Sequence, residues 1–471
     1  MSYSSKLNKI FKISWQSQAI ISNDYNLTYK EFYNTANALA EHLKKLNKKP
    51  GDTVAIRLIN GPKYCIAYLA CIIGNFVAVP INQELTEEEQ DFIYESSSPS
   101  YLIDENLVFP SLKQEYCSEP NFSNSNLEYD VIFFTSGTTG RPKGVCHSLN
   151  SLIGNAVAFN EMLDLDKSLR MYHVLPMAYM AGFLNTIVCP IMVGGCILIG
   201  PRFEPSHSMI FWNKAIEWNA NSVWLTPTLT AIIVKFTRDK EVIRKISLLM
   251  TNIFCGTAPL PDKLRNKFIS LFNTPLQESF GMSEILLVSC QNREEARKEF
   301  NVGKLLPELR VLEKNSNNED ELLIKSPWRL KNYLIDGKKI LPLVNNGYMS
   351  TGDIGKIKNN KLFITGRIKD LIIRGGVNVF PLSIESVISS QDNVEEVIVL
   401  GLPHDFWGEQ ICVCLILKRL SIKDKTLKLI RKLVKERISS SMQPDQYFVL
   451  DKFPKNSNGK IIKKLLAEKV Q

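Results

Sequence analysis

Residues 131–145 have the sequence VIFFTSGTTGRPKGV. An apolar, strand-like run, Val131–Phe134, leads into a loop, residues 135–144, that holds three glycines, four hydroxyl side chains and two cations. Glycine lets the backbone approach a ligand closely and adopt positive φ, and successive N–H groups can then line a nest for an anion. The hydroxyl groups and Lys143 add further attraction for negative charge. The loop is therefore predicted to bind a polyphosphate; a plain turn between two strands is the alternative.

Two common phosphate loops do not fit this stretch. The P-loop of the NTPases needs G-x-x-x-x-G-K-[ST], but here no Gly-Lys-Ser/Thr occurs and a proline precedes Lys143. The spacing also differs from G-x-G-x-x-G, so the dinucleotide-binding fingerprint is excluded. A nucleophile elbow, G-x-S-x-G, is not supported at Ser136 or Ser283.

The composition is that of an ordinary globular protein, with 471 residues, 45% hydrophobic and 22% charged. Lys and Arg number 57 and Asp and Glu 48, so the net charge is +9. Over this length the excess is mild: it suits anionic ligands but does not indicate nucleic acid. The five histidines show no metal-ligand spacing, so a zinc site is not expected.

The ten cysteines include no C-x-x-C pair and several lie in apolar runs, so we expect reduced thiols in a cytoplasmic protein. The N-terminal residues lack the continuous apolar core of a secretory signal. The longest apolar stretch, Tyr64–Ile81, is interrupted by Gly74, Asn75 and Pro80. It is predicted to form a buried helix and a strand rather than a membrane span.

Strand-like and helix-like segments alternate along the first part of the chain, which is typical of α/β layers. Residues 54–58, 76–81 and 100–104 are predicted strands, and residues 61–73 and 86–96 are predicted helices, the second opening on Thr86. Further on, the polar turn at residues 314–320 separates Arg310–Leu312 from Glu321–Ile324 and predicts a hairpin.

After Gly366 the pattern changes to that of a small α+β domain. Val394–Leu402 and Gln410–Leu417 are strand-like, and Cys412 and Cys414 alternate on one face of the second. The basic stretch Lys423–Ile438 carries its apolar residues on one helical face. A membrane or nucleic-acid surface is one interpretation of this helix, but the solvated outer face of a packed helix is favoured.

The segment TSGTTGRPKGV resembles the signature of the adenylate-forming superfamily, which includes acyl- and aryl-CoA synthetases, adenylation domains of peptide synthetases and luciferases. Six other segments resemble this family's motifs in the same order, and the resemblance runs from about Leu27 to Lys460. It implies an α/β fold, with a large multi-subdomain N-terminal domain of layered sheets and helices over residues 1–366. A hinge at residues 367–369 and a small mobile α+β C-terminal domain over residues 370–471 would follow.

The nucleotide site is implied by several of these motifs. In FGMSE, residues 280–284, Phe280 would stack on adenine, Ser283 would contact the α-phosphate and Glu284 would hold Mg²⁺. In STGD, Asp353 would accept from both ribose hydroxyls, with Arg367 also reaching the ribose. The full implied set is Thr135, Ser136, Gly137, Thr138, Thr139, Gly140, Lys143, Gly256, Thr257, Ala258, Ser279, Phe280, Gly281, Met282, Ser283, Asp353, Arg367 and Lys460.

The resemblance implies that chemistry depends on Lys460, Thr138, Glu284 and Lys143. Lys460 lies in PKNSNGK, which resembles the family's C-terminal Pro-Lys-Thr-x-x-Gly-Lys with Asn456 in place of threonine. Lys369 would be the hinge whose torsions rotate the small domain. That rotation would bring the thiol-transfer loop, Gly375, Gly376 and Val377, to the acyl adenylate.

The acid pocket is implied near residues 175–183, 221–227 and 255–283. Tyr179 stands where related acyl- and aryl-CoA ligases often have histidine. No Asp in residues 177–183 could pair an α-ammonium group, and the apolar residues favour a fatty or aryl acid. The implied pocket residues are Tyr179, Met180, Gly182, Phe183, Trp224, Gly256 and Gly281.

The resemblance thus implies ATP-dependent conversion of a small-molecule carboxylic acid to acyl-AMP and pyrophosphate, followed by transfer to the thiol of CoA. The alternative acceptor is the phosphopantetheine of an acyl carrier protein in a biosynthetic pathway. A third possibility is a relative that binds ligands without turnover. The presence of Lys460, Glu284 and Asp353 favours an active enzyme that uses ATP, Mg²⁺ and CoA, with no nucleic-acid partner and no membrane span.

Overall fold

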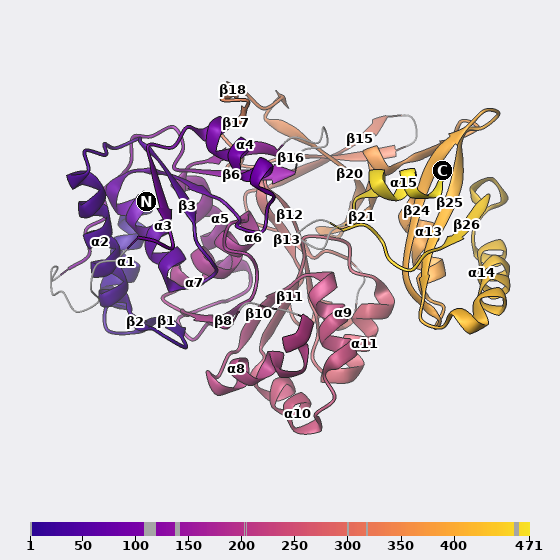
Figure 1. Ribbon diagram of the computed structural model, residues 1–471, viewed down its shortest axis with the longest axis horizontal. Coiled ribbons are helices and arrows are strands. Elements are labelled where there is room, and N and C mark those ends of the chain that lie inside the picture. Colours follow the sequence, from indigo (N-terminus) through magenta and orange to yellow (C-terminus); the bar gives the residue numbers. More distant parts are fainter. Residues whose placement is uncertain are drawn as a thin grey trace. The chain divides into compact units, whose positions relative to one another are not determined.

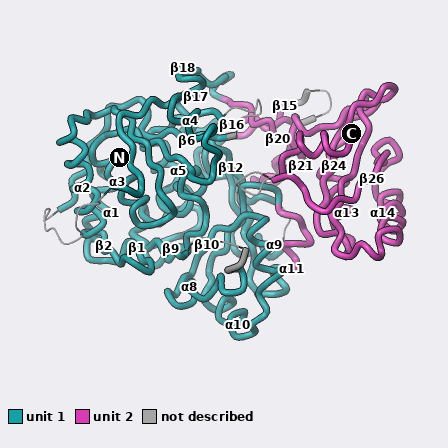
Figure 2. The backbone as a smooth tube through the Cα atoms, viewed as in Figure 1, with its two compact units in different colours: residues 1–259, 268–310, 325–347 teal, residues 260–267, 311–324, 348–471 magenta. Residues whose placement is uncertain are grey.

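The computed structural model describes residues 2–107, 119–136, 142–201, 203, 205–298, 301–316, 319–455 and 461–471. The chain divides into two compact units, coloured separately in Figure 2. Unit 1 comprises residues 1–259, 268–310 and 325–347, and unit 2 comprises residues 260–267, 311–324 and 348–471. This division follows spatial contacts and is interleaved along the sequence, so the boundary expected at residues 367–369 stays a prediction.

The first sheet of unit 1 has seven strands, of which β18, β17, β6 and β3 are labelled in Figure 1. Their order is β18 (Lys338–Ile340), β17 (Asn332–Ile335), β7 (Pro142–His147), β6 (Val131–Ser136), β4 (Val77–Pro80), β3 (Thr53–Arg57) and β5 (Tyr101–Asp104). Strands β6, β4, β3 and β5 run parallel, whereas β7, β17 and β18 continue the sheet as antiparallel neighbours.

A second sheet runs through unit 1. Its strands follow the order β14 (Lys304–Leu305), β13 (Leu286–Cys290), β12 (Gln277–Met282), β11 (Asn252–Cys255), β10 (Ser222–Leu225), β8 (Arg170–His173), β9 (Cys196–Ile199), β1 (Gln18–Ser22) and β2 (Asn26–Thr28). The strands from β12 to β1 are parallel and β13 turns back antiparallel on β12. The central strands β8, β9, β10 and β11 are almost entirely buried, as expected for parallel strands covered on both faces.

Helices connect these strands. In unit 1 they are α1 (Tyr3–Ile13), α2 (Tyr29–Lys45), α3 (Pro62–Gly74), α4 (Glu87–Ser97), α5 (Leu149–Met162), α6 (Met180–Phe183), α7 (Cys189–Ile191), α8 (Phe211–Glu217), α9 (Pro227–Phe236), α10 (Lys240–Leu249) and α12 (Glu295–Lys298). A π-helical turn, Leu184–Val188, separates α6 from α7. Helix α11 (Asp262–Phe272) crosses the sequence boundary between the units.

The helix starts follow from local sequence. Thr86 accepts from the Glu89 N–H while the Glu89 carboxylate accepts from the Thr86 N–H at 2.9 Å, so α4 opens with a capping box. Helix α3 begins on Pro62 and ends where Asn75 adopts a left-handed conformation. The strands and helices expected between residues 54 and 104 are confirmed to within one or two residues.

Unit 2 contains antiparallel strands β15 (Arg310–Ser316), β16 (Glu319–Lys325), β20 (Tyr348–Lys358) and β21 (Lys361–Arg367). Its separate five-stranded sheet consists of β23 (Val377–Val379), β22 (Ile372–Arg374), β25 (Gly408–Leu417), β24 (Val394–His404) and β26 (Gln446–Val449). Helices α13 (Pro381–Ser389), α14 (Lys423–Arg437) and α15 (Lys463–Val470) complete it. The expected α+β pattern after Gly366 is confirmed, and the two strands expected at residues 394–402 and 410–417 pair antiparallel as β24 and β25.

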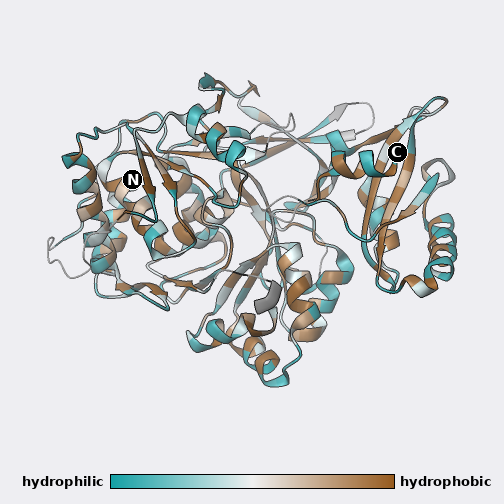
Figure 3. Ribbon diagram, in the orientation of Figure 1, coloured by the Kyte–Doolittle hydropathy of each residue, from teal (hydrophilic) through white to brown (hydrophobic). Residues whose placement is uncertain are grey.

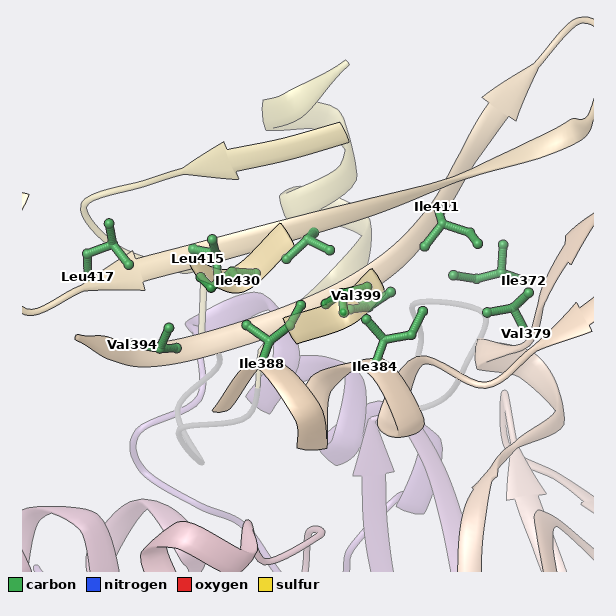
Figure 4. Close-up of a cluster of buried hydrophobic side chains, with 12 residues drawn as sticks. Ile372, Val379, Ile384, Ile388, Val394, Val399, Ile411, Leu415, Leu417 and Ile430 are labelled. Atoms are coloured by element: carbon green, nitrogen blue, oxygen red, sulfur yellow. The ribbon is translucent and has the colours of Figure 1, made fainter. Parts of the chain in front are cut away.

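Figure 4 shows the core of this small sheet, where side chains of β24 and β25 pack against α13 and α14. Alternation along β25 decides which face each residue covers. Ile411 and Leu415 belong to this core, whereas Cys412 and Cys414 belong to a second cluster with Leu466 of α15. The predicted placement of the two cysteines on one strand face is confirmed.

Among the described residues, no helix combines the length and the apolar character needed to cross a bilayer. The stretch from Tyr64 to Ile81 forms α3 and β4 instead, as predicted. The nine described cysteines are all free and buried.

Candidate active site

The glycine- and hydroxyl-rich loop joins two strands of the first sheet. Strands β6 and β7 are antiparallel, and their register pairs Thr135 with Lys143 and Ser136 with Pro142. The Thr135 hydroxyl reaches the Lys143 carbonyl at 3.5 Å. Both strand ends are thereby fixed by the sheet. The predicted residues Gly137, Thr138, Thr139 and Gly140 lie outside the described residues.

The FGMSE segment forms the end of the β12–β13 hairpin. Phe280 and Met282 belong to β12, and Ser283 and Glu284 form the turn before Leu286, whose φ is +67°. At Gly281 an added Cβ would lie 2.5 Å from the Leu286 carbonyl oxygen, so the hairpin closes tightly only with glycine there. The half-buried turn presents a hydroxyl and a carboxylate side by side.

Two hydrogen bonds hold the backbone of this turn. The Nε2 atom of His147, at the end of β7, lies 2.7 Å from the Ser283 carbonyl oxygen, and the Leu330 N–H donates to the Glu284 carbonyl at 2.7 Å. Since a carbonyl oxygen only accepts, Nε2 carries the proton. Burial lowers the pKa of His147 to about 4, so the imidazole is neutral at physiological pH. The strand leaving the Gly/Thr loop is therefore bonded directly to the turn that carries Glu284.

Glu284 has a second neighbour in the first sheet. The Tyr333 hydroxyl, on β17, donates to the Glu284 carboxylate at 3.4 Å. Burial and the charge of Glu284 both raise the pKa of Tyr333, so the phenol stays protonated and able to donate. The Tyr333 hydroxyl thus orients one oxygen of the Glu284 carboxylate.

Residues 256–258, Gly-Thr-Ala, follow β11 and lie beside β12. An added Cβ at Gly256 would approach the Ser279 hydroxyl oxygen at 2.5 Å, so glycine permits this close contact. The Ser279 hydroxyl donates to the Cys255 carbonyl at 3.3 Å. Thr257 adopts φ +72°, a conformation uncommon for a threonine. The turn Gly256–Ala258 therefore lies close to the strand that ends in the FGMSE hairpin.

The segment from Leu175 to Phe183 is held by polar side chains of the first sheet region. Asn60 donates to the Leu175 carbonyl at 2.8 Å and accepts from the Met177 N–H at 2.9 Å. The Tyr68 hydroxyl donates to the Met177 carbonyl at 2.9 Å. The Asn82 amide donates to the Tyr179 hydroxyl at 3.0 Å. Tyr179 is thus a hydrogen-bonded, half-buried side chain at the start of α6.

The other predicted pocket residues differ in exposure. Met180 is 8% exposed and Phe183 3%, with the Phe183 ring 4.3 Å from that of Tyr68, measured between centroids. Trp224 is fully buried and packs on Phe254, with 4.7 Å between ring centroids. At Gly182 an added Cβ would lie 2.0 Å from the Pro176 carbonyl oxygen, so only glycine fits.

Unit 2 holds the ribose motif. Asp353 on β20 pairs in register with Arg367 on β21, and the guanidinium contacts both carboxylate oxygens, at 2.6 and 3.3 Å. The Asp353 side chain is 4% exposed and that of Arg367 36%. Gly352 supplies the positive φ, +67°, of the bend before Asp353. The bidentate geometry fixes the carboxylate direction.

A charged network follows Arg367. Lys369 is exposed in a 3₁₀ turn, Ile368–Asp370, and its neighbour Asp370 pairs with Lys463 at 3.0 Å. Nearby, Glu385 of α13 accepts from the Val399 N–H at 2.8 Å. Burial raises the pKa of Glu385 to about 7, against the opposing effect of Lys463. A carboxyl group of α13 that has a pKa near neutrality therefore senses the charges of Asp370 and Lys463.

The predicted thiol-transfer loop is a two-residue hairpin turn. Gly375 and Gly376, at φ +57° and +81°, join β22 to β23, as a type I′ turn requires. The Gly375 N–H donates to the Trp407 carbonyl at 2.8 Å, and an added Cβ there would lie 2.7 Å from the Trp407 ring. Arg374 beside the turn makes a bidentate pair with Asp445.

Lys460, like Gly137–Gly140, lies outside the described residues. The structure brings Thr135, Lys143, Ser283 and Glu284 into one connected framework within unit 1, and Asp353 with Arg367 within unit 2. Sequence reasoning missed His147, Tyr333, Asn60 and Asn82 as supporting residues. A lone histidine two residues after the signature carries no spacing signal, so only the fold reveals its contact with Ser283.

Comparison with known proteins decides the family. The family model described as AMP-binding enzyme matches residues 14–334, and that of the AMP-binding enzyme C-terminal domain matches residues 383–460. The chain belongs to the AMP-binding enzyme family. The resemblance to adenylate-forming enzymes is thereby confirmed.

Similar proteins in this family are CoA ligases. The long-chain-fatty-acid–CoA ligase of Mycobacterium tuberculosis is 27% identical, covering 95% of this chain and 94% of its own. The 2-succinylbenzoate–CoA ligase of Bacillus subtilis is 27% identical, covering 96% and 94%. The structure of o-succinylbenzoate CoA synthetase from Bacillus subtilis, in complex with its acyl-adenylate intermediate, matches with a TM-score of 0.81 at 25% identity, covering 98% of this chain and 97% of that one. The α/β fold with a large and a small domain is shared.

Proposed function

We propose that this protein activates a carboxylic acid with ATP and passes the acyl group to the thiol of CoA. In the first step a carboxylate oxygen would attack the α-phosphorus, giving acyl-AMP and pyrophosphate. In the second, the CoA thiol would attack the acyl carbon, form the thioester, lose its proton and release AMP. The observation that carries this proposal is the hydrogen bond from His147 to Ser283, because it joins the phosphate-loop hairpin to the turn bearing Glu284.

The proposed roles follow from charge and position. An acid and ATP are both anions, so the reaction needs cations and donors aimed at the transferring phosphoryl group. Lys143 would serve the outer phosphates, Ser283 the α-phosphate, and Thr138 and Lys460 would complete the site. Asp353, already oriented by Arg367, would accept from the ribose hydroxyls. No general base is required, because the acid substrate is already ionised.

Glu284 fits a magnesium ligand. Its carboxylate is half-buried and oriented by Tyr333, and carboxylate oxygens are hard ligands suited to Mg²⁺. Over the described part of the chain, no group of three or more His, Cys, Asp or Glu side chains could form an all-protein cage. Glu284 would hold Mg²⁺ there, and the ion would supply positive charge to neutralise the phosphates.

A fatty or aryl acid is the proposed substrate class. The supporting observation is the apolar, buried character of Met180 and Phe183 around Tyr179. The relatives named above act, by their names, on a long-chain fatty acid and on succinylbenzoate, both without an α-amino group. Lys369 as the hinge and Gly375–Val377 as the thiol-transfer loop belong to the same proposal. So does a cytoplasmic location, which the free, buried cysteines support.

The proposal is tested by incubating the purified protein with MgATP and a panel of fatty, aryl and amino acids, with and without CoA. Pyrophosphate release and product masses are measured together. Acid-dependent release with an acyl-CoA product is expected from a fatty or aryl acid. Pyrophosphate release with acyl-AMP as the final product, even when CoA is present, would indicate that the acceptor is a carrier protein. Release with amino acids alone would contradict the proposed substrate class.

A further inference from the structure

The positive charge of this protein is concentrated in one segment. Residues 418–437, KRLSIKDKTLKLIRKLVKER, contain nine Lys and Arg against two Asp and Glu, a net charge of +7. The other 451 residues hold 48 basic and 46 acidic residues, a net +2. Most of the excess of +9 therefore lies in this segment, which comprises Lys418, Arg419, the turn Leu420–Ile422 and α14.

In the structure, the lysines of α14 face away from the core of the small sheet. Helix α14 packs Thr426, Ile430 and Val434 inward, and Ile430 and Val434 join the core of the small sheet. Lysines stand on the opposite, exposed side at a spacing of three and four residues, which places them along one stripe. This lysine stripe consists of Lys425, Lys428, Lys432 and Lys435, all exposed. Figure 3 shows α14 predominantly hydrophilic.

A purely solvated helix does not explain this stripe. Like charges three or four residues apart repel and destabilise a helix, whereas solvated helices usually alternate signs. Among the described residues, only Lys432 of the four pairs with an acid, Glu436, at 4.0 Å. The side chain of Lys432 is still 74% exposed. The helix therefore retains repulsion that an anionic partner would relieve.

Apolar side chains are exposed next to the stripe. Leu420 is 57% exposed, Ile422 40% and Leu429 49%. Leu420 and Ile422 lie in the 3₁₀ turn that precedes α14, and Leu429 lies on the helix between Lys428 and Lys432. Exposed apolar residues among cations are typical of segments that sit at a lipid interface. A nucleic-acid backbone would use the cations but offers no apolar layer for these three side chains.

We propose that residues 418–437 form a docking surface for an anionic lipid bilayer. The lysine stripe would neutralise acidic headgroups, and Leu420, Ile422 and Leu429 would enter the boundary between headgroups and acyl chains. This association is peripheral and electrostatic, so it requires no spanning helix. The inference is independent of the proposed catalytic residues, because none of them lies in this segment.

The test is co-sedimentation of the full chain with phosphatidylcholine vesicles, with or without about 30 mol% phosphatidylserine. We expect binding only to the anionic vesicles, and weaker binding as salt rises. Changing Lys425, Lys428, Lys432 and Lys435 together to Gln should weaken binding by about five-fold per residue, more than about 100-fold in all. Equal binding by this variant and the parent would overturn the proposal.

A matched control removes the same charge elsewhere. Lys9, Lys12, Lys44 and Lys45 are exposed lysines of α1 and α2, and their joint change to Gln lowers the net charge equally. This control should bind the vesicles within a few-fold of the parent. If it loses binding as severely as the stripe variant, net charge alone attracts the protein and the docking surface is wrong.

Two further measurements separate lipid from nucleic acid. Leu420→Ser with Leu429→Ser should weaken vesicle binding at high salt, where the electrostatic part is screened, and leave binding to a short DNA duplex unchanged. A stripe variant that loses DNA binding but keeps vesicle binding would identify a nucleic-acid surface instead. Acid-dependent pyrophosphate release should be unchanged in every variant, so a failure of the proposed function leaves the vesicle result interpretable.

Discussion

Two titratable groups, one in each unit, bond to neighbouring backbone: buried His147 and half-buried Glu385, whose pKa values are shifted in opposite directions. His147 in unit 1 bonds to the Ser283 carbonyl as a neutral imidazole, with its pKa lowered to about 4. Glu385 in unit 2 accepts from the Val399 N–H, with its pKa raised to about 7. Burial causes both shifts, because it disfavours whichever form is charged.

The two regions should therefore respond differently to pH and salt. The backbone of the turn carrying Ser283 and Glu284 is held by hydrogen bonds between uncharged groups. Changes of pH near neutrality and changes of salt concentration should therefore leave this turn unchanged. The segment near Lys369 is held by the ion pair between Asp370 and Lys463. Glu385 bonds to Val399 instead, and its pKa of about 7 is influenced by both charges of that ion pair. The proposed phosphate site is therefore expected to be insensitive to pH near neutrality, whereas the region near the predicted hinge is expected to respond to it.

The largest expected effect comes from Glu284→Gln. Loss of the proposed magnesium ligand should slow acid-dependent pyrophosphate release by about 10²–10³-fold, because electrostatic stabilisation dominates this chemistry. The unit 1 framework should stay intact, since the turn is held through its backbone. Glu294→Gln, at an exposed carboxylate of unit 1, is the control and should keep full activity. Similar rates for both variants would remove Glu284 from the site.

A smaller effect is expected from Asp353→Asn in unit 2. Arg367 would lose its bidentate partner and the ribose its carboxylate, so KM for ATP should rise by about 10–100-fold, at about 1.4 kcal/mol for each factor of ten. Steady-state kinetics measure this, with the exposed Asp451→Asn as control. An unchanged KM would separate the Asp353–Arg367 pair from nucleotide binding.

Substitutions of His147 test the importance of its hydrogen bond to the Ser283 carbonyl. His147→Leu leaves the Ser283 carbonyl without its donor, a cost of about 1–3 kcal/mol, and pyrophosphate release should fall about ten-fold. His147→Gln can donate through its amide and should recover most of that loss. Loss of activity to the same extent in both variants would show that shape, not the hydrogen bond, matters.

The two units should also show opposite pH dependence. Between about pH 6.5 and 4 the unfolded state binds a proton that folded His147 excludes, so local stability of unit 1 falls as pH falls, by up to about 3 kcal/mol. Between about pH 4.5 and 7 folded Glu385 keeps a proton that the unfolded state has lost, so local stability of unit 2 falls as pH rises.

Hydrogen-exchange mass spectrometry at several pH values, corrected for intrinsic rates, reads both units at once. Glu385→Gln should flatten the pH dependence for peptides of α13 and β24 and leave β7 unaffected. Loss of protection in β7 and α13 in the same direction of pH change would contradict the opposite pH dependence expected from His147 and Glu385.

Much of this fold could be predicted because local signals agree with it. Thr86 with Glu89 fixes the start of α4, and alternation in β25 assigns Cys412 and Cys414 to one face. The anchors could not be predicted in this way. His147 and Tyr333 are distant in sequence from Ser283 and Glu284, and only sheet pairing brings them together.

The basic helix α14 also shows a property that could not be predicted from the sequence. Its sequence predicted α14 correctly, but periodicity alone favoured an ordinary solvated face. The exposure of Leu420, Ile422 and Leu429 depends on how the helix packs, and this exposure changed the interpretation. Burial is a property of the folded chain, so it had to be observed.

The proposed reaction forms an acyl adenylate before any thiol reacts. Isotope exchange between labelled pyrophosphate and ATP, measured with acid but without CoA, tests it most directly. We predict exchange that depends on a fatty or aryl acid, requires Mg²⁺, and is nearly abolished by Glu284→Gln. Exchange that appears only when CoA is present, or turnover that yields ADP and phosphate in place of AMP and pyrophosphate, would show that no acyl adenylate forms ahead of the thiol.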